Sequence, residues 1–557
     1  MTVTGNGTGT GTGAEWWRGA VIYQIYPRSF RDASGDGLGD LAGITETLDY
    51  VAGLGVEAIW ISPFYKSPMR DFGYDIADHR AVDPLFGTLD DFRRLLDKAH
   101  DLNLKVLIDL VLSHTSDEHP WFAESRQSRD NPKADWYVWA DPKADGTAPN
   151  NWLSVFGGVA WSWEPRRRQY YLHNFLATQP DLNLHNTAVQ DQLLSDAAFW
   201  LDLGVDGFRL DAVNFCTHDP ALRDNPPLQP GERPTDGVHL DNPYAYQRHL
   251  YDKTQPETLT ILKRLRSLTD RYDRRATMGE VSGDNSLAIA ADYTKGGDRL
   301  NMAYTFNLLT PTFSAAHLRA VVEEMEGGID DGWPCWAFSN HDVVRAVSRW
   351  SNDGDGDDDF ARLLMALLLS LRGSVCLYQG EELGLPEAEV PFERLQDPYG
   401  KAFWPEFKGR DGCRTPMPWR AAEDHAGFSP AEPWLPIDPR HLERAVDRQD
   451  HVPGSLLNAY RGFLAWRRRQ PALRWGSLRF ADLDEPLLAF ERRHAGQQLL
   501  ALFNCSPEPQ SARLTAWPGL AALDGHGFAA SLENARLQVP RYGVFFGAIQ
   551  QASGNGD

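Results

Sequence analysis

The hydrophobic pattern alternates, from about Trp16 onward, between short apolar runs and longer amphipathic stretches. Short runs rich in β-branched residues are typical of buried strands, and apolar residues spaced three and four apart predict helices. Eight strand-like runs occur at 21–26, 57–62, 104–112, 205–211, 276–281, 302–306, 335–340 and 374–379. Helix-like stretches include 89–102, 188–204, 257–272 and 456–471. Eight strands separated by helices predict an α/β fold, a (β/α)8 TIM barrel, although counting alone leaves a doubly wound sheet open.

Two regions interrupt this alternation. A segment rich in Trp, Asn and Pro, 115–181, separates the third and fourth strands, and its length predicts an inserted domain. After 456–471 the pattern changes to short strands and turns, which is typical of a β-sandwich. The expected organisation is a disordered leader at 1–14, a first barrel part at 15–114, the inserted domain at 115–181, a second barrel part at 182–474 and a C-terminal β-sandwich at 475–557.

Composition narrows the class of partner. The chain has 557 residues, of which 42% are hydrophobic, and its formal net charge is −22. Nucleic-acid binding needs a basic surface, and the sequence has no basic stripe, so we expect no nucleic-acid partner. The 19 tryptophans supply a large core, and some of them are expected to stack on sugar rings.

Cysteine usage and the N-terminal segment bear on the compartment. The five cysteines are widely spaced and form no CxxC pair, which argues against a zinc site or a disulfide framework and favours free thiols in a reducing compartment. The Gly/Thr-rich first residues lack the basic and apolar parts of a secretion signal. The longest apolar run, 363–371, is too short to cross a bilayer. We therefore expect a cytoplasmic protein without a membrane partner.

Polar residues gather where the predicted strands end, which is the face of a TIM barrel that carries catalytic groups. They are Asp109 and His114 on the third strand, Arg209 and Asp211 on the fourth, Glu280 on the fifth, and Asn340, His341 and Asp342 on the seventh. One carboxylate at a strand end is readily explained as a helix cap. Several carboxylates together with histidines and an arginine at one rim favour an active site.

Two of these carboxylates have contrasting surroundings. Arg209 and Asp211 are two residues apart, so both side chains point to the same face of the strand. A neighbouring guanidinium lowers the pKa of a carboxyl group, which keeps a nucleophile ionised. Glu280 follows an apolar strand, where burial favours the protonated form that a general acid needs. Such a pair is the machinery of glycoside hydrolysis.

Several motifs give the chain a family resemblance. The segments VLIDLVLSHTS, GFRLDAVNF, MGEV and FSNHD resemble the conserved regions of the α-amylase family, glycoside hydrolase family 13. The chain also resembles the α-glucosidase and oligo-1,6-glucosidase branch in four segments: QPDLN, LYQGEELG, RDGCRTPMPW and the opening WWRGAVIYQIYPRSF. These motifs occur in order along nearly the whole chain, and several are long. The resemblance implies a TIM-barrel enzyme that cleaves α-glucosides with retention of configuration.

The resemblance also implies catalytic roles. Asp211 would be the nucleophile that forms a β-glucosyl-enzyme, and Glu280 would be the acid/base. Asp342 would hold the 2- and 3-hydroxyls of the glucose, and Arg209 would position the nucleophile.

Further residues are expected to bind the cleaved glucose. Tyr74 resembles the stacking platform of the family, and His114 and His341 would hydrogen-bond hydroxyls of the same sugar. Asp71 resembles the carboxylate that binds the terminal 4-hydroxyl, with Arg414 as its partner. A charged pair there would block further subsites and make the enzyme exo-acting; the alternatives are a turn residue and a surface ion pair.

Three residues are expected near the leaving group. Phe156 and Phe175 of the inserted domain would flank the pocket, although buried phenylalanine is usually core. Ala212 follows the nucleophile, at a position where relatives that prefer α-1,6 links commonly have Val. Because Ala leaves more room than a β-branched residue, we expect short α-1,4-linked glucosides to be hydrolysed best.

The stretch DASGDGLGD resembles the first half of a calcium loop, because oxygen-bearing side chains recur at every second position. The resemblance implies a structural Ca²⁺, with Mg²⁺ as the alternative, bound by Asp32, Ser34, Asp36, the backbone carbonyl of Leu38, and Asp40. Many relatives have Asn where this chain has Ser34, a poorer ligand. The alternative is an Asp/Gly turn without metal.

Other activities stay open on the same fold. They are an oligo-1,6-glucosidase, a sucrose hydrolase and a trehalose-forming mutase. Some relatives are non-enzymatic subunits of amino-acid transporters, but those lack the three carboxylates that this chain keeps, so that reading is rejected. The expected partners are small α-glucosides and hydroxyl acceptors, with no organic cofactor, in a monomer or homodimer.

Overall fold

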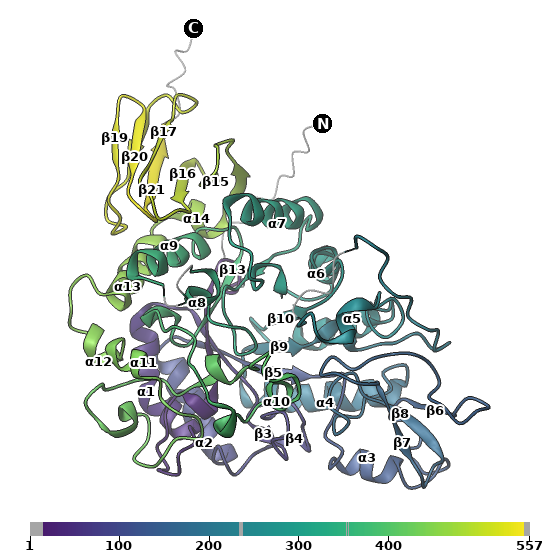
Figure 1. The fold of residues 1–557 in the computed structure, drawn as a ribbon. Coiled ribbons are helices and arrows are strands. Elements are labelled where there is room, and N and C mark those ends of the chain that lie inside the picture. The colour runs from purple at the N-terminus through teal and green to yellow at the C-terminus, as the bar shows by residue number, and fades with distance from the viewer. Residues whose placement is uncertain (1–14, 233–237, 352–353, 355, 551–557) are drawn as a thin grey trace.

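The computed structural model describes residues 15–232, 238–351, 354 and 356–550 (Figure 1). Eight parallel strands form one sheet in the order β11-β10-β9-β5-β2-β1-β13-β12. They are β1 (Val21–Ile25), β2 (Ala58–Ile61), β5 (Lys105–Val111), β9 (Gly207–Asp211), β10 (Ala276–Val281), β11 (Met302–Thr305), β12 (Cys335–Trp336) and β13 (Ser374–Tyr378). All eight lie within the predicted runs. The predicted leader at 1–14 lies outside the described residues.

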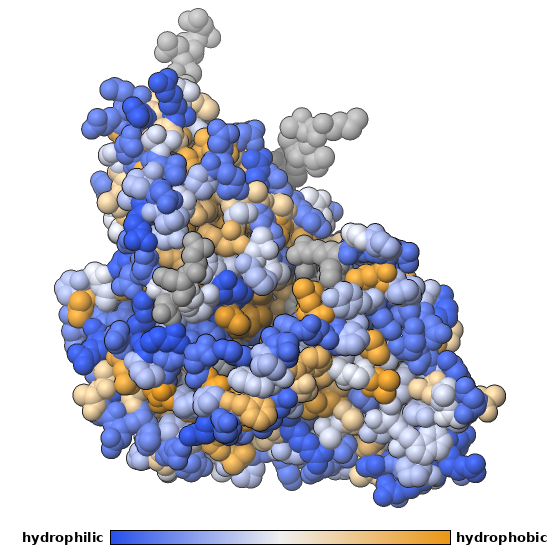
Figure 2. All heavy atoms as spheres, in the orientation of Figure 1, coloured by the Kyte–Doolittle hydropathy of each residue, from blue (hydrophilic) through white to orange (hydrophobic). Residues whose placement is uncertain are grey.

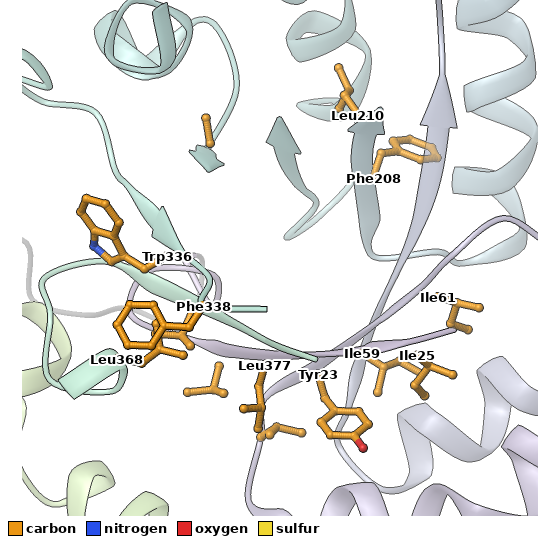
Figure 3. Packing of buried hydrophobic residues seen from close by; sticks show 14 of the residues in the cluster. Tyr23, Ile25, Ile59, Ile61, Phe208, Leu210, Trp336, Phe338, Leu368 and Leu377 are labelled. Carbon is orange, nitrogen blue, oxygen red and sulfur yellow. The ribbon is translucent and has the colours of Figure 1, made fainter. Parts of the chain in front are cut away.

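A single parallel bridge between Ala303 and Pro334 joins the two edge strands, so the sheet nearly closes into a barrel. The interior is filled by side chains that include Ile22, Trp60, Leu107 and Met278. Alternate residues face outward, and Figure 3 shows Tyr23 and Ile25 of β1 beside Ile59 and Ile61 of β2. Burial on both faces explains why these strands read as nearly continuous apolar runs.

The seventh strand is shorter than predicted. Only Cys335 and Trp336 pair with β13, whereas the apolar run extends to 340. Beyond Trp336 the backbone makes local bonds instead: the Ala346 amide donates to the Ser339 hydroxyl, and Arg349 donates to the Phe338 carbonyl. The chain therefore leaves the sheet early and enters the rim of the barrel.

Helices lie between the strands, and the four predicted ones are present within a few residues of their expected bounds. The longer helices are α1 (Leu41–Leu54), α2 (Leu89–Asp101), α4 (Thr187–Leu203), α5 (Thr258–Thr269), α6 (Ser286–Thr294), α7 (Ala315–Gly328), α9 (Asp358–Leu368) and α13 (Leu456–Arg468). A capping box between Thr88 and Asp91 begins α2. Gly204, at φ 108°, ends α4 in the left-handed region that glycine tolerates.

Two antiparallel regions flank the barrel. The insert contains α3 (Pro120–Ser125) and a small sheet in the order β6-β8-β7, formed by β6 (Trp139–Ala140), β7 (Trp161–Glu164) and β8 (Gln169–Leu172). At the C-terminus a five-stranded and a three-stranded sheet share a core, and Figure 1 shows them at the opposite end from the insert. Their strands are β14 (Ser477–Phe480), β15 (Leu487–His494), β16 (Gln497–Asn504), β17 (Gln510–Arg513), β18 (Leu520–Ala522), β19 (Ser531–Glu533), β20 (Arg536–Val539) and β21 (Val544–Ile549). The predicted fold class is confirmed.

All five cysteines are free, and four of them are buried. Within the described ranges, no helix combines the length and apolar character that crossing a bilayer requires. The face of the molecule in Figure 2 is mostly hydrophilic, with apolar residues scattered among charged ones.

Candidate active site

One arginine holds three carboxylates at the carboxyl end of β5, β9 and β10. Nη1 of Arg209 lies 2.5 Å from Oδ1 of Asp109 and 2.7 Å from Oδ1 of Asp211, and Nη2 contacts the Glu280 carboxylate. The strand register sets Arg209 beside Asp109 and beside Met278, two residues before Glu280. Arg209 is completely buried. The sequence prediction that these residues meet at one rim is confirmed.

Burial raises the pKa of Asp211 to about 7, and Arg209 opposes this shift. Burial likewise raises the pKa of Asp109 to about 6 against the same guanidinium. The expectation that Arg209 would hold the pKa of Asp211 below its ordinary value is therefore wrong in its net direction. The guanidinium does favour the ionised form, but removal from water is the larger effect, and the negative charges of Asp109 and Asp342 add to it.

Tyr304 is a further member of this cluster that the sequence analysis missed. Its hydroxyl donates to Oε2 of Glu280 at 2.9 Å and accepts from Nη2 of Arg209 at 2.9 Å. Tyr304 lies on β11, paired with Glu280 in the register of β10. Its place near the end of a predicted strand was the available signal, but tyrosine is common in strands and does not stand out there.

Asp342 lies between two arginines. Nη2 of Arg414 is 2.7 Å from its Oδ1, and Nη1 of Arg410 is 3.3 Å from the same atom. Burial works against the charge of Asp342, but His341 and these two guanidinium groups outweigh it and hold its pKa well below the ordinary value. Asp342 is therefore ionised at neutral pH.

The predicted pair of Asp71 with Arg414 is wrong. Asp71 instead receives hydrogen bonds from Arg410 Nη2 and from Gln179 Nε2, both at 3.0 Å. Arg414 lies deeper, where its Nε donates to the His341 carbonyl at 2.6 Å. Both arginines belong to RDGCRTPMPW, four residues apart around a 3-10 turn, and the motif alone does not say which of them faces Asp71. Arg410 and Gln179 are thus two residues that the sequence analysis missed.

Tyr74 and His341 are stacked, with ring centroids 5.5 Å apart and planes within 5°. Gln24 Nε2 lies 2.7 Å from Nδ1 of His341, and the Tyr74 hydroxyl lies 2.8 Å from its Nε2. His341 is fully buried behind Tyr74, whereas His114 lines the cavity and contacts the Tyr74 carbonyl at 3.2 Å. Burial lowers the pKa of His114 to about 4 and that of His341 to about 3, so both rings are neutral at pH 7.

These groups surround a cavity of about 520 Å³. We call five of the polar lining residues the polar wall: Asp71, Tyr74, His114, Asp342 and Arg410. We call five of the apolar lining residues the apolar wall: Val155, Phe215, Phe306, Leu309 and Val343. Asp211 and Glu280 also line the cavity. The arrangement presents two reactive carboxylates to a ligand that has a polar part and a less polar part.

Three predicted residues lie near the reactive carboxylates. Phe156 and Phe175 of the insert line the cavity with their rings 5.7 Å apart, and the Arg410 guanidinium lies over Phe156 at 5.0 Å. Ala212 also lines the cavity, and its backbone is left-handed at φ 39° and ψ 47°. This conformation is strained for a residue other than glycine, and a β-branched side chain would increase the strain.

The carboxylates of the predicted calcium loop accept hydrogen bonds from within the loop. Oδ1 of Asp32 accepts from the Ser34 hydroxyl and the Gly35 amide, and its Oδ2 accepts from the Gly37 amide. Asp40 accepts from the Ser34 amide and caps α1. The described part of the chain holds no group of three or more His, Cys, Asp or Glu side chains placed to bind a metal. In this arrangement the carboxylates serve hydrogen bonds of a turn, so the residues do not fit the ion as they stand.

Comparisons with known proteins agree with this site. Residues 24–476 match the catalytic domain of α-amylase. The chain is 56% identical to a protein named "Probable alpha-glucosidase" from Rhizobium meliloti, over 96% of this chain and 97% of that one. It is 38% identical to an oligo-1,6-glucosidase of Heyndrickxia coagulans, over 88% and 92% of the two chains.

Solved structures agree as well. The crystal structure of the α-glucosyl transfer enzyme XgtA has a TM-score of 0.94 and 59% identity, over 96% of this chain and all of that one. The trehalulose synthase MutB of Pseudomonas mesoacidophila has a TM-score of 0.86 and 32% identity, over 97% and 100% of the two chains. Because the family model matches most of the chain and these relatives are at least 30% identical over most of it, this chain belongs to the α-amylase family.

Proposed function

We propose that this chain is a retaining α-glucosidase that removes single glucosyl units from the non-reducing end of short α-glucosides. The observation that carries the proposal is the sharing of one buried guanidinium by Asp211 and Glu280 inside the cavity. A guanidinium is only a few ångströms wide. Its bridging position therefore supports the separation of about 5–5.5 Å that retention needs, rather than the 6.5–9.5 Å of inverting enzymes.

The reaction takes two steps. Asp211 attacks the anomeric carbon while Glu280 gives its proton to the glycosidic oxygen, so that one C–O bond forms as the other breaks. Glu280, now ionised, then takes a proton from water, whose oxygen attacks the anomeric carbon and releases Asp211. Two inversions give net retention. Arg209 offsets the negative charge of both carboxylates throughout the cycle.

The polar wall supports recognition of a terminal glucose. Asp71 and Arg410 offer an acceptor and donors to hydroxyls, and Asp342 offers an ionised acceptor. Tyr74 presents a ring on which the sugar can stack. Because this wall is built of paired charges held by further buried partners, it favours one terminal sugar over a continuing chain. The preference for α-1,4 links rests on the small side chain of Ala212 beside Asp211.

A second candidate activity is transfer of the glucosyl unit to an alcohol. The apolar wall supports it, because an acceptor with an apolar body would displace water there and present its hydroxyl to Glu280. Transfer and hydrolysis differ only in which oxygen attacks the glucosyl-enzyme, so one site serves both.

Time-resolved proton NMR with maltose, isomaltose and sucrose tests these proposals together. The first glucose released from maltose should be the α anomer, and maltose should be turned over faster than isomaltose. β-Glucose in the first minutes would contradict the mechanism. Faster turnover of isomaltose or sucrose would favour an oligo-1,6-glucosidase or a sucrose hydrolase, and conversion of maltose to trehalose would favour a mutase.

The calcium site remains a proposal of its own. Binding would require Asp32 and Asp40 to exchange amide and hydroxyl donors for the ion. A rise of the melting temperature on adding Ca²⁺ to chelator-treated protein would support it, because an ion that binds only the folded state stabilises that state. An unchanged melting temperature up to millimolar Ca²⁺ would contradict it.

A further inference from the structure

A buried lysine lies in the cavity without an acceptor. Lys253 is 3% exposed and lines the cavity together with Asp211 and Glu280. Its Nζ lies 4.6 Å from the ring centre of Phe215 and 5.3 Å from that of Tyr244. Across the residues that the structure describes, this ammonium makes no hydrogen bond and no ion pair. The residue as a whole is buried, but it lines the cavity, where a ligand can supply the partner that the protein does not.

The nearest acidic residue in sequence does not pair with it. Asp252 places Oδ2 2.6 Å from Nδ1 of His249, and that imidazole stacks on Tyr244 with ring centroids 3.7 Å apart. Burial lowers the pKa of Lys253, and the negative charges of Asp252 and Asp284 oppose this shift. The Tyr244 hydroxyl is buried too and has no hydrogen-bond partner among the described side chains and backbone. The Lys253 ammonium and the Tyr244 hydroxyl are thus both without a partner among the described residues.

The backbone of Lys253 is tied to the catalytic strands. The amide of Thr254 donates to the Asn214 carbonyl at 2.6 Å, and the Asn214 side-chain amide donates to the Ser282 carbonyl at 2.8 Å. Asn214 follows Asp211 by three residues, and Ser282 follows Glu280 by two. These bonds fix the lysine relative to the reacting carboxylates rather than leaving it on a free loop.

Among the described cations that line the cavity, Lys253 is the one without a hydrogen-bond or ion-pair partner. Arg410 pairs with Asp71 and Asp342, and Arg209 behind the cavity pairs with Asp211 and Glu280. Arg349, which also lines the cavity, donates to backbone carbonyls such as that of Thr310 at 3.1 Å. The catalytic carboxylates therefore have their own counter-charges, and the Lys253 ammonium is left to pair with an anionic group that enters the cavity, although Asp252 and Asp284 also place negative charge near it.

Resting on the α-glucosidase function proposed above, we propose that Lys253 is a specificity residue that binds an anionic oxygen, such as a carboxylate, on the leaving group or acceptor. Phe215 and Tyr244 hold the aromatic or aliphatic body of such a ligand, while the glucosyl unit occupies the polar wall. The site thus favours acidic α-glucosides over neutral ones of the same size.

The test compares two aryl α-glucosides that differ only in charge, 4-carboxyphenyl and 4-carbamoylphenyl α-D-glucoside, in the wild type, Lys253→Met and Lys253→Arg. The quantity measured is the ratio of their kcat/KM values, which does not depend on the amount of folded enzyme. The wild-type ratio should exceed that of Lys253→Met by about tenfold, as expected for one charge-assisted hydrogen bond. Lys253→Arg should keep most of the preference. Lys263→Met, a change at an exposed lysine of α5, should leave the ratio unchanged.

A ratio that is the same in the wild type and in Lys253→Met would overturn the inference, as would an equal loss in Lys263→Met. Activity on neutral 4-nitrophenyl α-D-glucoside separates the two proposals. If the wild type cleaves this substrate without any preference for the carboxylate, only the role of Lys253 fails. If it cleaves no α-glucoside, the proposed function fails and the inference fails with it.

Discussion

The polar and apolar walls of the cavity differ in how completely their polar atoms are satisfied. In the polar wall Asp71 has two donors, Asp342 has two guanidinium neighbours, and Arg410 contacts a third carboxylate, Asp397, at 2.8 Å. The apolar wall consists of hydrocarbon surfaces, and Lys253 elsewhere in the lining has no hydrogen-bond or ion-pair partner among the described residues. A preorganised network recognises one ligand geometry because every partner has a fixed position. A hydrocarbon surface tolerates many shapes. We therefore expect selectivity for glucose to come from the polar wall and tolerance toward the other half of the substrate to come from the apolar wall.

The largest expected loss of activity comes from replacing Asp211 or Glu280, which line the cavity. Asp211→Ala should lower kcat/KM on maltose by a factor on the order of 10³ or more, and Glu280→Gln by about 10²–10⁴. With 4-nitrophenyl α-D-glucoside the leaving group needs no acid, so Glu280→Gln should still show a burst of nitrophenol, and azide should accelerate its turnover. Asp211→Ala should show neither behaviour. Identical kinetics in the two variants would mean that the roles are assigned wrongly.

Removing the shared cation of the polar wall should cost the next largest amount. Arg410→Met leaves Asp71 and Asp397 buried without their partner, a change worth about 3–5 kcal/mol. If part of this loss falls on glucose binding, kcat/KM on maltose drops by about a hundredfold. Inhibition by free glucose should weaken in parallel, while the KM for an alcohol acceptor in transfer should hardly move.

Arg467→Met is the control for this variant. Arg467 is as deeply buried, but it donates to the backbone carbonyls of Leu369 and Gly19 away from the cavity. It should lower the melting temperature without weakening glucose inhibition. If the two variants lose stability and activity in the same proportion, the polar wall is only a structural support.

Tyr304→Phe should produce a smaller and more selective loss. The hydroxyl donates to Glu280, so removing it costs one hydrogen bond to a charged group and lowers turnover of maltose by about tenfold or more. The donor favours ionised Glu280, the form that activates water. The second step should therefore slow more than the first, and azide, which needs no base, should restore part of the rate with 4-nitrophenyl α-D-glucoside.

Tyr23→Phe offers matched chemistry elsewhere. The Tyr23 hydroxyl donates to the buried carboxylate of Glu382 at 2.7 Å, outside the cavity lining. Azide should accelerate only Tyr304→Phe, whatever either substitution does to stability. An absence of azide acceleration there would show that Tyr304 acts by packing alone.

The same contrast explains how much of the molecule was predictable. All eight barrel strands were found because strands buried on both faces read as continuous apolar runs. The charged rim was found because Asp211, Glu280 and Asp342 lie at the end of such a run or just beyond it. The partner of Asp71 was missed because Arg410 and Arg414 both lie in an irregular turn, where spacing does not determine direction. Lys253 was missed because its surroundings come from the long segment between β9 and α5, whose contacts are set by tertiary packing.

The smallest expected effect concerns the preference for linkage and comes from Ala212, the residue after Asp211. Ala212→Val should shift the ratio of kcat/KM values from maltose toward isomaltose, because a β-branched side chain narrows the cavity against a 1,4-linked ring. A change of methyl size in a pocket is worth about 1–3 kcal/mol, so a tenfold shift is expected. The left-handed backbone at φ 39° adds a cost of about 1–3 kcal/mol to stability, because a β-branched residue is poorly accommodated there. The ratio of the kcat/KM values on the two substrates separates these effects, since a loss of folded enzyme lowers both rates alike.

Ala212→Ser, which adds one small polar atom without β-branching, serves as the control and should change the ratio less. If Ala212→Val slows both substrates equally, Ala212 only packs against the barrel wall, and the preference for linkage must arise from the apolar wall instead.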